Sequence, residues 1–197
     1  MHGKVGGDLL RQVAMPTLLV THDLAEANLL ADRIAVYDEG QILQLGAPAE
    51  IMHRPANLAV ARLTGLKNCF KGYVEAILPD RLRVRVGPLR LTTPRYPVNS
   101  GQPVYACLRP EQLILLDPAQ PANPADNIVR ARVESVTTDG LTFFLQLCLI
   151  ESRLLPDSRY DFIAALPLHA YELLTPAAGQ VWPVWLKQSA IHLIPAA

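Results

Sequence analysis

The first residue of the chain whose type and position could do chemistry is His22. It stands between the apolar run at residues 17–20 and Asp23, which can start a helix. An imidazole at the end of a strand can hydrogen-bond the negative charge that develops on a transferred phosphoryl group. Phosphoryl transfer also needs a phosphate-binding loop and a metal ion, so the meaning of His22 depends on what the rest of the sequence supplies.

The residues that commonly bind metals or form redox pairs are scattered. Cys69, Cys107 and Cys148 lie far apart and form no C-x-x-C pair, so the spacing predicts neither a zinc site nor a redox dithiol. His169 and His192 stand far from any carboxylate or cysteine at ligand spacing. We interpret both as surface or satisfied core histidines, and we assign no metal site.

The charge of the chain gives no sign of a nucleic-acid partner. Eighteen basic residues balance eighteen acidic ones. Arg81, Arg83 and Arg85 alternate with apolar residues in "RLRVRV", which could be a nucleic-acid surface or the solvated face of an amphipathic strand. No aromatic residue is interleaved with these arginines, so we favour the solvated face and expect no nucleic acid to bind.

Composition predicts a cytoplasmic protein with its own hydrophobic core. Half of the 197 residues are apolar, which is enough for a core without disulfides or metal. Thiols without a disulfide framework fit a reducing compartment. The first ten residues contain no apolar signal region, and no apolar stretch is long enough to span a membrane.

The first third of the chain alternates strand and helix signals. The run at 17–20 is typical of a buried parallel strand, but without neighbouring strands we expect Leu18, Leu19 and Val20 to expose an apolar surface. Asp23 can cap the helix that follows, with Glu26 as its capping-box partner. Two strands are then predicted around a turn at 38–40, followed by short helices that Pro55 interrupts.

From Gly65 onward the pattern is that of β-strands. In "RLRVRV", residues 81–86, the apolar residues all point one way and the arginines the other. Asp139 and Gly140 give a hairpin signal before another alternating strand. This region therefore predicts a mainly β fold.

The β region also contains a degenerate repeat. Units at 65–117 and 127–197 both end in a "GQ" turn, a short apolar stretch, a basic residue and a final apolar strand. The segment 118–126 between them is rich in proline and alanine and is predicted to be a linker. Repeated five-strand units of this size are typical of small closed barrels, which leave no strand edge open.

These stretches together resemble a known family. "PTLLVTHDLAEANLLADRIAVYDEGQILQLGAPAEIMHRPANLAVARLTGLKN" resembles the end of the nucleotide-binding domain of ATP-binding-cassette (ABC) importer ATPases. "LRPEQLILL" and "AGQVWPVWLKQSAIHL" resemble the C-terminal regulatory domain of molybdate, sulfate, iron and polyamine importer ATPases. The resemblance implies two oligomer-binding-like (OB-like, TOBE/MOP-type) barrel repeats, preceded at 1–64 by an incomplete α/β remnant of the ATPase domain.

The resemblance gives His22 a role only within a complete ATPase. It matches the switch histidine that contacts the γ-phosphate and helps to position the attacking water. ATP and Mg²⁺ are the cofactors of the complete family protein, and we expect none in this chain. "GKVGGD" at 3–8 lacks the phosphate-loop pattern, and there is neither an "LSGGQ"-like signature nor an apolar strand ending in Asp-Glu.

The resemblance also implies an oxyanion site in the barrels. Lys187 and Ser189 match the basic and hydroxyl positions of molybdate-type barrels, and Asn68 and Asn127 match the asparagine of the family's "S-A-R-N" segment. The chain departs from the serine and arginine of that segment in both repeats. The replacements are Gly65 and Lys67 in the first repeat and Pro124 and Asp126 in the second. The added aspartate opposes anion binding, and a strand end that simply faces solvent is the alternative for Lys187 and Ser189.

Two functions follow from these features. The first is the regulatory and dimerisation region of an ABC importer ATP-binding subunit, which senses the transported oxyanion and works with permease subunits at the inner face of the membrane. The second is a stand-alone cytoplasmic oxyanion-binding protein of the molybdate type. An active ATPase is expected only if these residues are part of a longer protein.

We predict that the purified chain does not hydrolyse ATP and forms a dimer. The residues that position phosphates and metal carry most of this reaction, and His22 alone cannot replace them. A coupled phosphate-release assay with Mg²⁺ and ATP checks the first part, and magnesium-dependent turnover would refute it. Light scattering on a sizing column checks the second, with an expected mass of twice 21.6 kDa.

Overall fold

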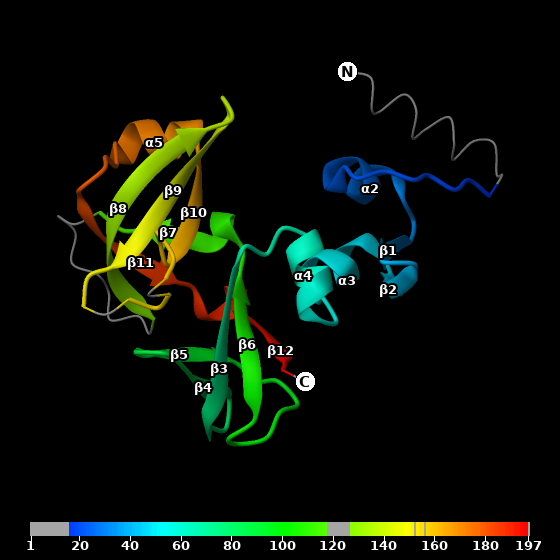
Figure 1. Ribbon diagram of the computed structural model, residues 1–197, viewed down its shortest axis with the longest axis horizontal. Coiled ribbons are helices and arrows are strands. Elements are labelled where there is room, and N and C mark those ends of the chain that lie inside the picture. The colour runs from blue at the N-terminus through cyan, green and yellow to red at the C-terminus, as the bar shows by residue number, and fades with distance from the viewer. Residues whose placement is uncertain (1–15, 118–126, 152, 156, 197) are drawn as a thin grey trace. The chain divides into compact units, whose positions relative to one another are not determined.

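A computed structural model describes residues 16–117, 127–151, 153–155 and 157–196. The chain divides into two compact units, Met1–Thr64 and Gly65–Ala197 (Figure 1). The predicted linker at 118–126 and the glycines at 3–8 lie outside the described residues. None of the helices within the described ranges is long and apolar enough to cross a membrane.

The first unit contains a β-hairpin and short helices, as the sequence predicts. Its elements are α2 (Leu24–Leu30), β1 (Ile34–Asp38), β2 (Gln41–Gly46), α3 (Pro48–His53) and α4 (Leu58–Leu63). The hairpin turns at Glu39 and Gly40, which both have positive φ angles, of 44° and 83°. The side chain of Gln44 ties the hairpin to the chain between α3 and α4, because it bonds the Arg54 carbonyl and the Ala56 N–H.

Residues 17–20 are exposed, as expected of an apolar run without neighbouring strands, whereas the capping-box prediction is wrong. Residues 17–20 form no strand, and the side chains of Leu18 and Val20 are 91% and 88% exposed. A buried parallel strand needs neighbours on both sides, and the described part of this unit offers only the β1–β2 hairpin. Asp23 does cap α2, but Glu26 does not complete a capping box, because the Asp23 N–H donates to the Thr21 hydroxyl instead, at 3.0 Å.

The second unit consists of two five-stranded antiparallel sheets. The first has the order β12-β6-β3-β4-β5, and the second has the order β10-β9-β8-β11-β7. The strands of the first are β3 (Asn68–Ile77), β4 (Arg81–Val86), β5 (Leu89–Pro94), β6 (Pro103–Leu108) and β12 (His192–Pro195). Those of the second are β7 (Leu113–Leu115), β8 (Ile128–Thr138), β9 (Thr142–Leu149), β10 (Phe162–Pro167) and β11 (Val181–Leu186). The unit also contains α5 (Leu168–Leu174) and the short 3₁₀ turns η1 (Pro110–Gln112) and η2 (Gln188–Ala190). The mainly β, OB-like fold class is therefore confirmed.

The last strand of each repeat belongs to the sheet of the other repeat. β7 comes from the first repeat and pairs with β11, whereas β12 comes from the second repeat and pairs with β6 (Figure 1). The sequence indicates these strands but not their partners, and it led us to expect that each repeat would close its own barrel. The exchange makes each sheet incomplete without the other half of the unit.

The structure contains the internal repeat that the sequence indicates. β3 and β8 each carry a bulge at an equivalent glutamate, Glu75 and Glu134. The turn glycines that follow are also equivalent, because Gly101 and Gly179 both donate to the first long strand of their repeat, each at 2.8 Å. A bulge strengthens the local twist of a strand, so both copies curl their sheets at the same place.

One hydrophobic core joins the two sheets. The alternation of "RLRVRV" is confirmed, because Leu82 and Val84 are fully buried. Phe70 of β3 and Phe162 of β10 meet edge to face, with ring centroids 5.0 Å apart. Apolar side chains from both sheets form a single buried cluster, so the packing, like the strand exchange, couples the two halves.

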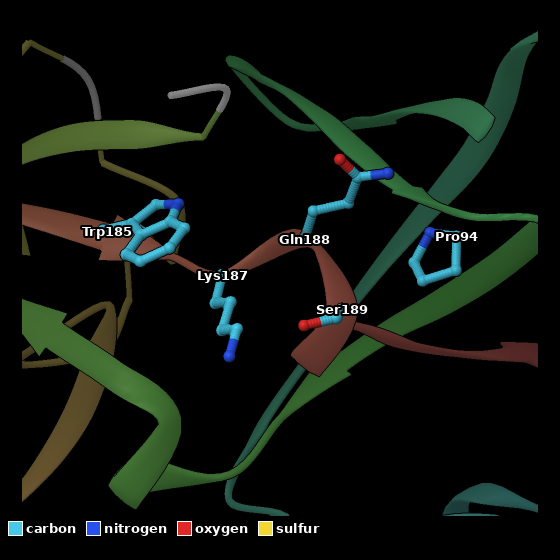
Figure 2. A pocket seen from close by; sticks show the side chains of 5 residues that line it. All are labelled: Pro94, Trp185, Lys187, Gln188 and Ser189. Atoms are coloured by element: carbon cyan, nitrogen blue, oxygen red, sulfur yellow. The ribbon is translucent and has the colours of Figure 1, made fainter. Parts of the chain in front are cut away.

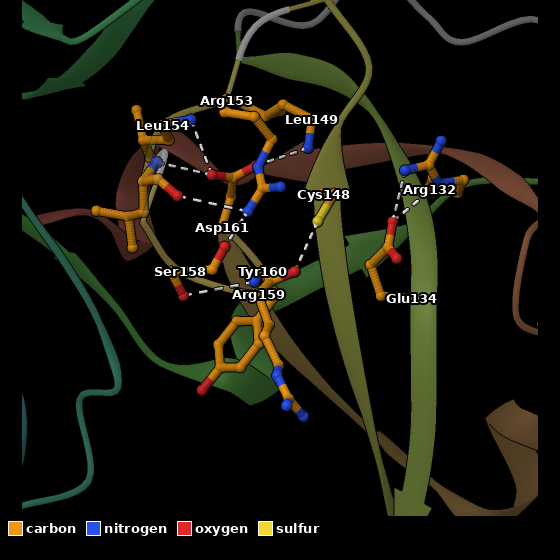
Figure 3. Close-up of polar contacts among 11 residues, drawn as sticks. Arg132, Glu134, Cys148, Leu149, Arg153, Leu154, Ser158, Arg159, Tyr160 and Asp161 are labelled. Atoms are coloured by element: carbon orange, nitrogen blue, oxygen red, sulfur yellow. Dashed lines mark hydrogen bonds and ion pairs between the residues drawn. The ribbon is translucent and has the colours of Figure 1, made fainter.

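The second repeat carries an additional loop between β9 and β10 that is organised around one carboxylate. Asp161 is 2% exposed and accepts from the N–H groups of Leu149, Leu154 and Leu155, at 2.8–2.9 Å. The guanidinium of Arg153 also donates to it, at 3.1 Å (Figure 3). Because a buried charge is costly unless it is fully hydrogen-bonded, these donors explain why Asp161 can stabilise the loop.

We predict that Gly72→Ala destabilises the unit by about 3 kcal/mol, the upper end for an overpacked site. A Cβ at Gly72 would lie 2.2 Å from the Arg85 carbonyl oxygen, so β3 and β4 would have to separate. Urea unfolding followed by circular dichroism measures the loss. Ala131 is the equivalent residue of the second repeat, and Ala131→Gly is the matched control, expected to cost only about 1 kcal/mol. Equal effects of the two substitutions would contradict this account.

Candidate functional site

A shallow hollow of about 250 Å³ lies where the chain leaves β11 and turns through η2 toward β12. We call it the crossover hollow, and its lining residues are Pro94, Trp185, Lys187, Gln188 and Ser189 (Figure 2). The alternation of β11 buries Trp182, Val184 and Leu186 and leaves Trp185 on the outer face. The strand pattern therefore presents an indole to the hollow, just before the basic and hydroxyl residues.

Lys187 and Ser189 both line the crossover hollow. Both side chains are exposed, and both point to the same side of the ribbon in Figure 2. Gln188 points away from them toward β5, where its amide reaches the Thr93 carbonyl at 3.5 Å. An ammonium group and a hydroxyl group are donors that suit an anion with several oxygens. The binding role of Lys187 and Ser189 stays a prediction.

Asn127 holds two walls of the crossover hollow in place. Its Oδ1 accepts from the Thr92 N–H at 2.6 Å, while its Nδ2 donates to the carbonyls of Thr92 and Leu186, at 2.7 and 3.1 Å. The Leu186 N–H donates in turn to the Asn127 backbone carbonyl, at 3.0 Å. Thr92 precedes Pro94 by two residues and Leu186 immediately precedes Lys187. Both Nδ2 hydrogens are thus engaged with backbone carbonyls, which gives the asparagine a positioning role.

Asn68 makes the equivalent contact in the other half of the unit. Its amide donates to the Ile163 carbonyl at 2.9 Å and accepts from the Ile163 N–H at 2.8 Å. Asn68 is 2% exposed, and it starts β3 just as Asn127 precedes β8. Each asparagine amide thus pairs with backbone groups as a neighbouring strand would. It bonds the N–H and carbonyl of one residue in an outermost strand of the opposite sheet, β5 for Asn127 and β10 for Asn68. We call these two contacts the asparagine clamps.

His22 belongs to the first unit, whereas the groups described above belong to the second. Its side chain is exposed immediately before α2. The N–H groups of Glu26 and Ala25 hold the pKa of the neighbouring Asp23 below its ordinary value, which suits a charged helix cap. The catalytic role of His22 stays a prediction about a complete ATPase.

The sequence indicates one further feature of the crossover hollow but not another. Within the described ranges, no three His, Cys, Asp or Glu side chains gather as the ligands of a metal ion would. The alternation in "VWPVWL" could have placed Trp185 on the outer face. No local signal connects Pro94 of the first repeat with a hollow built from residues of the second.

The chain is similar to ATP-binding subunits of importers. It is 38% identical over 136 residues to the spermidine/putrescine import ATP-binding protein PotA of Marinobacter nauticus, covering 68% of this chain and 36% of PotA. It is 33% identical over 141 residues to the Fe(3+) ions import ATP-binding protein FbpC 2 of Rhizobium meliloti, covering 68% of this chain and 35% of that protein. No protein-family model matches the chain.

The fold is similar to that of a solved structure of the cytoplasmic molybdate-binding protein ModG with molybdate bound. The TM-score is 0.55 at 18% sequence identity, and the match covers 66% of this chain and 96% of the ModG chain. The paired barrels therefore share the OB-like fold of ModG. Together with the sequence relatives, this confirms the resemblance: the chain is a homologue of ABC importer ATP-binding subunits. It spans about a third of the length of the relatives described above.

We predict that loss of the Asn127 clamp destabilises the unit by about 2–3 kcal/mol, because the Thr92 and Leu186 backbone groups lose their partners. Asn127 has a φ of 69°, a left-handed conformation that glycine tolerates. Asn127→Gly therefore removes the amide without adding backbone strain, whereas Asn127→Ala adds that strain. Thermal unfolding should rank wild type above Asn127→Gly and Asn127→Gly above Asn127→Ala. A glycine variant as stable as wild type would show that the clamp contributes nothing.

Proposed function

We propose that the chain is the regulatory, dimer-forming C-terminal region of the ATP-binding subunit of an ABC importer. The observation that carries this is the length of the similarity to an import ATP-binding subunit: it covers 136 residues, more than the first unit contains, and so extends into the OB-like barrels. In the complete protein, segments outside this chain bind ATP and Mg²⁺, and His22 contacts the γ-phosphate. The complete subunit pairs with a second copy and works with permease subunits.

The same proposal gives the location of the protein. The homology to import ATP-binding subunits supports a cytoplasmic position. We extend this to the inner face of the membrane, where such a subunit can meet its permease. Regulation then requires that a ligand of the barrels bind one arrangement of the paired ATPases better than another.

The ligand that the crossover hollow fits is an oxyanion, held by the Lys187 ammonium and the Ser189 hydroxyl. Relatives named for spermidine/putrescine or Fe(3+) import do not suggest such a ligand. The proposal therefore depends on the chemistry of the hollow and on the fold it shares with ModG, which is described as molybdate-binding. The site would hold the anion by one full positive charge and several hydrogen-bond donors.

The equivalent turn of the first repeat does not have this chemistry. η1 follows Arg109 and contains Glu111, where η2 follows Lys187 and contains Ser189. A carboxylate repels an anion at the position where the hydroxyl would bind it. We therefore infer one oxyanion site per chain, in the crossover hollow.

The position of the crossover hollow suggests how binding could be transmitted. η2 joins β11 of the second sheet to β12 of the first. An anion bound by Lys187 and Ser189 would bridge the segment along which the chain passes from one sheet to the other. Binding would favour the arrangement in which the Lys187 ammonium and the Ser189 hydroxyl both face the anion. A ligand that binds one arrangement better than another can regulate the protein.

We predict that the chain binds molybdate, tungstate or sulfate and that Lys187→Gln weakens binding at least tenfold. A charge-assisted hydrogen bond contributes about 1.5–3 kcal/mol. Trp185 lines the hollow and should report binding through its fluorescence, while isothermal titration gives the affinity and the number of sites.

One control substitution and one further variant make this test specific. Lys71→Gln removes an exposed lysine of β3 and should leave the affinity unchanged. Ser189→Ala should weaken binding while the chain stays folded. The absence of binding by the folded wild-type chain would overturn the oxyanion proposal, and two equal sites would overturn the inference of a single one.

A further inference from the structure

Two cysteines that are far apart in the sequence face each other in the first sheet. In the pairing of β3 with β6, Cys69 lies directly opposite Cys107. Successive residues of a strand point to opposite faces, so residues that are directly opposite point to the same face. The two thiols therefore lie side by side, although their spacing in the sequence predicts no dithiol.

The hydrogen-bond pattern of β3 and β6 shows how close the two cysteines are. The Val74 N–H donates to the Gln102 carbonyl at 3.0 Å, so Val74 stands at a hydrogen-bonded position of this ladder. Such positions alternate along an antiparallel pair, and Cys69 is an odd number of residues from Val74. Cys69 and Cys107 therefore form a non-hydrogen-bonded pair, whose Cα atoms lie about 4.5 Å apart. This separation is within the range of roughly 4.4–6.8 Å that a disulfide requires.

The surroundings of the three cysteines differ. Cys69 is partly exposed, and its Sγ lies 3.4 Å from the Leu66 carbonyl oxygen, whereas Cys107 is fully buried. Cys148 belongs to β9 in the other sheet, and burial raises the pKa of its thiol. Cys107 is no less buried, so what distinguishes it from Cys148 is its place directly opposite Cys69. Solvent-borne oxidants can thus reach Cys69 first, while Cys107 is placed to react next.

We propose that Cys69 and Cys107 form a reversible thiol–disulfide site that is oxidised by hydrogen peroxide. The Cys69 thiolate attacks a peroxide oxygen, so that an S–O bond forms, the O–O bond breaks and water leaves after protonation. The Cys107 sulfur then attacks the sulfur of the sulfenic acid: the S–S bond forms, the S–O bond breaks, and the departing hydroxide takes the Cys107 proton and leaves as a second water. The two thiols give up two electrons and two protons, and the peroxide is reduced.

The disulfide would form beside one of the asparagine clamps. Cys69 follows Asn68, whose amide holds Ile163 of the other sheet. Cys107 also lies opposite His192 of β12, the exchanged strand. A bond between β3 and β6 would fix the sheet at the point where the second repeat attaches to it by both a clamp and a strand. The site therefore connects the redox state of the compartment with the coupling of the two barrels.

The test treats the full, folded chain with an equimolar amount of hydrogen peroxide and then alkylates the remaining thiols. Mass spectrometry should show the loss of two hydrogen atoms without added oxygen. Tryptic peptides should contain a Cys69–Cys107 link and an alkylated Cys148, and dithiothreitol should reverse the change. Sulfinic acid at Cys69 without the link, or a link between two chains only, would overturn the proposal.

Variants and an unfolded control test whether the fold selects the Cys69–Cys107 disulfide or whether the cysteines link at random. Cys148→Ala should still lose two hydrogen atoms, whereas Cys69→Ser and Cys107→Ala should not. In urea the oxidised wild-type chain should contain a mixture of links, including Cys107–Cys148. The same mixture without urea, in a sample whose circular dichroism shows it to be folded, would mean that the sheet does not select the pair.

Discussion

The exchange of β7 and β12 is the constraint on which the rest of the second unit depends. Each sheet obtains one of its outermost strands from the other repeat. A sheet deprived of that strand would leave one side of β6 or β11 with unpaired backbone groups, which is both unstable and prone to aggregation. The single hydrophobic core follows from the same arrangement, because the exchanged strands bring apolar residues of one repeat into the sheet of the other. The two repeats are therefore one folding unit.

The asparagine clamps provide hydrogen-bond partners for the other two outermost strands, β5 and β10. β5 and β10 have no strand beyond them in their sheets, yet Thr92 and Ile163 each donate to and accept from an asparagine amide. An amide is suited to this because it carries the same donor and acceptor as a peptide group. Asn127 also tolerates the positive φ that its position requires. Asparagine therefore suits this position both because it tolerates the positive φ and because its amide pairs with a peptide group.

The sequence was most informative where structure is determined locally. The alternation of "RLRVRV", the turns at Gly40 and Gly140 and the cap at Asp23 could all be predicted, because each depends on neighbours within a few residues. At 17–20 the apolar run forms no strand, because such a run indicates a strand only if other strands cover it. The partners of β7 and β12 could not be predicted, since three or four apolar residues fit either sheet. The same limit hid the pairing of Cys69 with Cys107, which depends on the register of two strands.

The strand exchange has a consequence for the order in which the protein is made on the ribosome. β12 is synthesised after every other strand of the unit, yet it completes the sheet whose first strand is β3. The first repeat must therefore wait, with β6 uncovered, while the whole of the second repeat is translated. Pairing between such distant segments is slow to form. During this interval the nascent chain depends on chaperones, or on its own transient contacts, to keep β6 from pairing with another molecule.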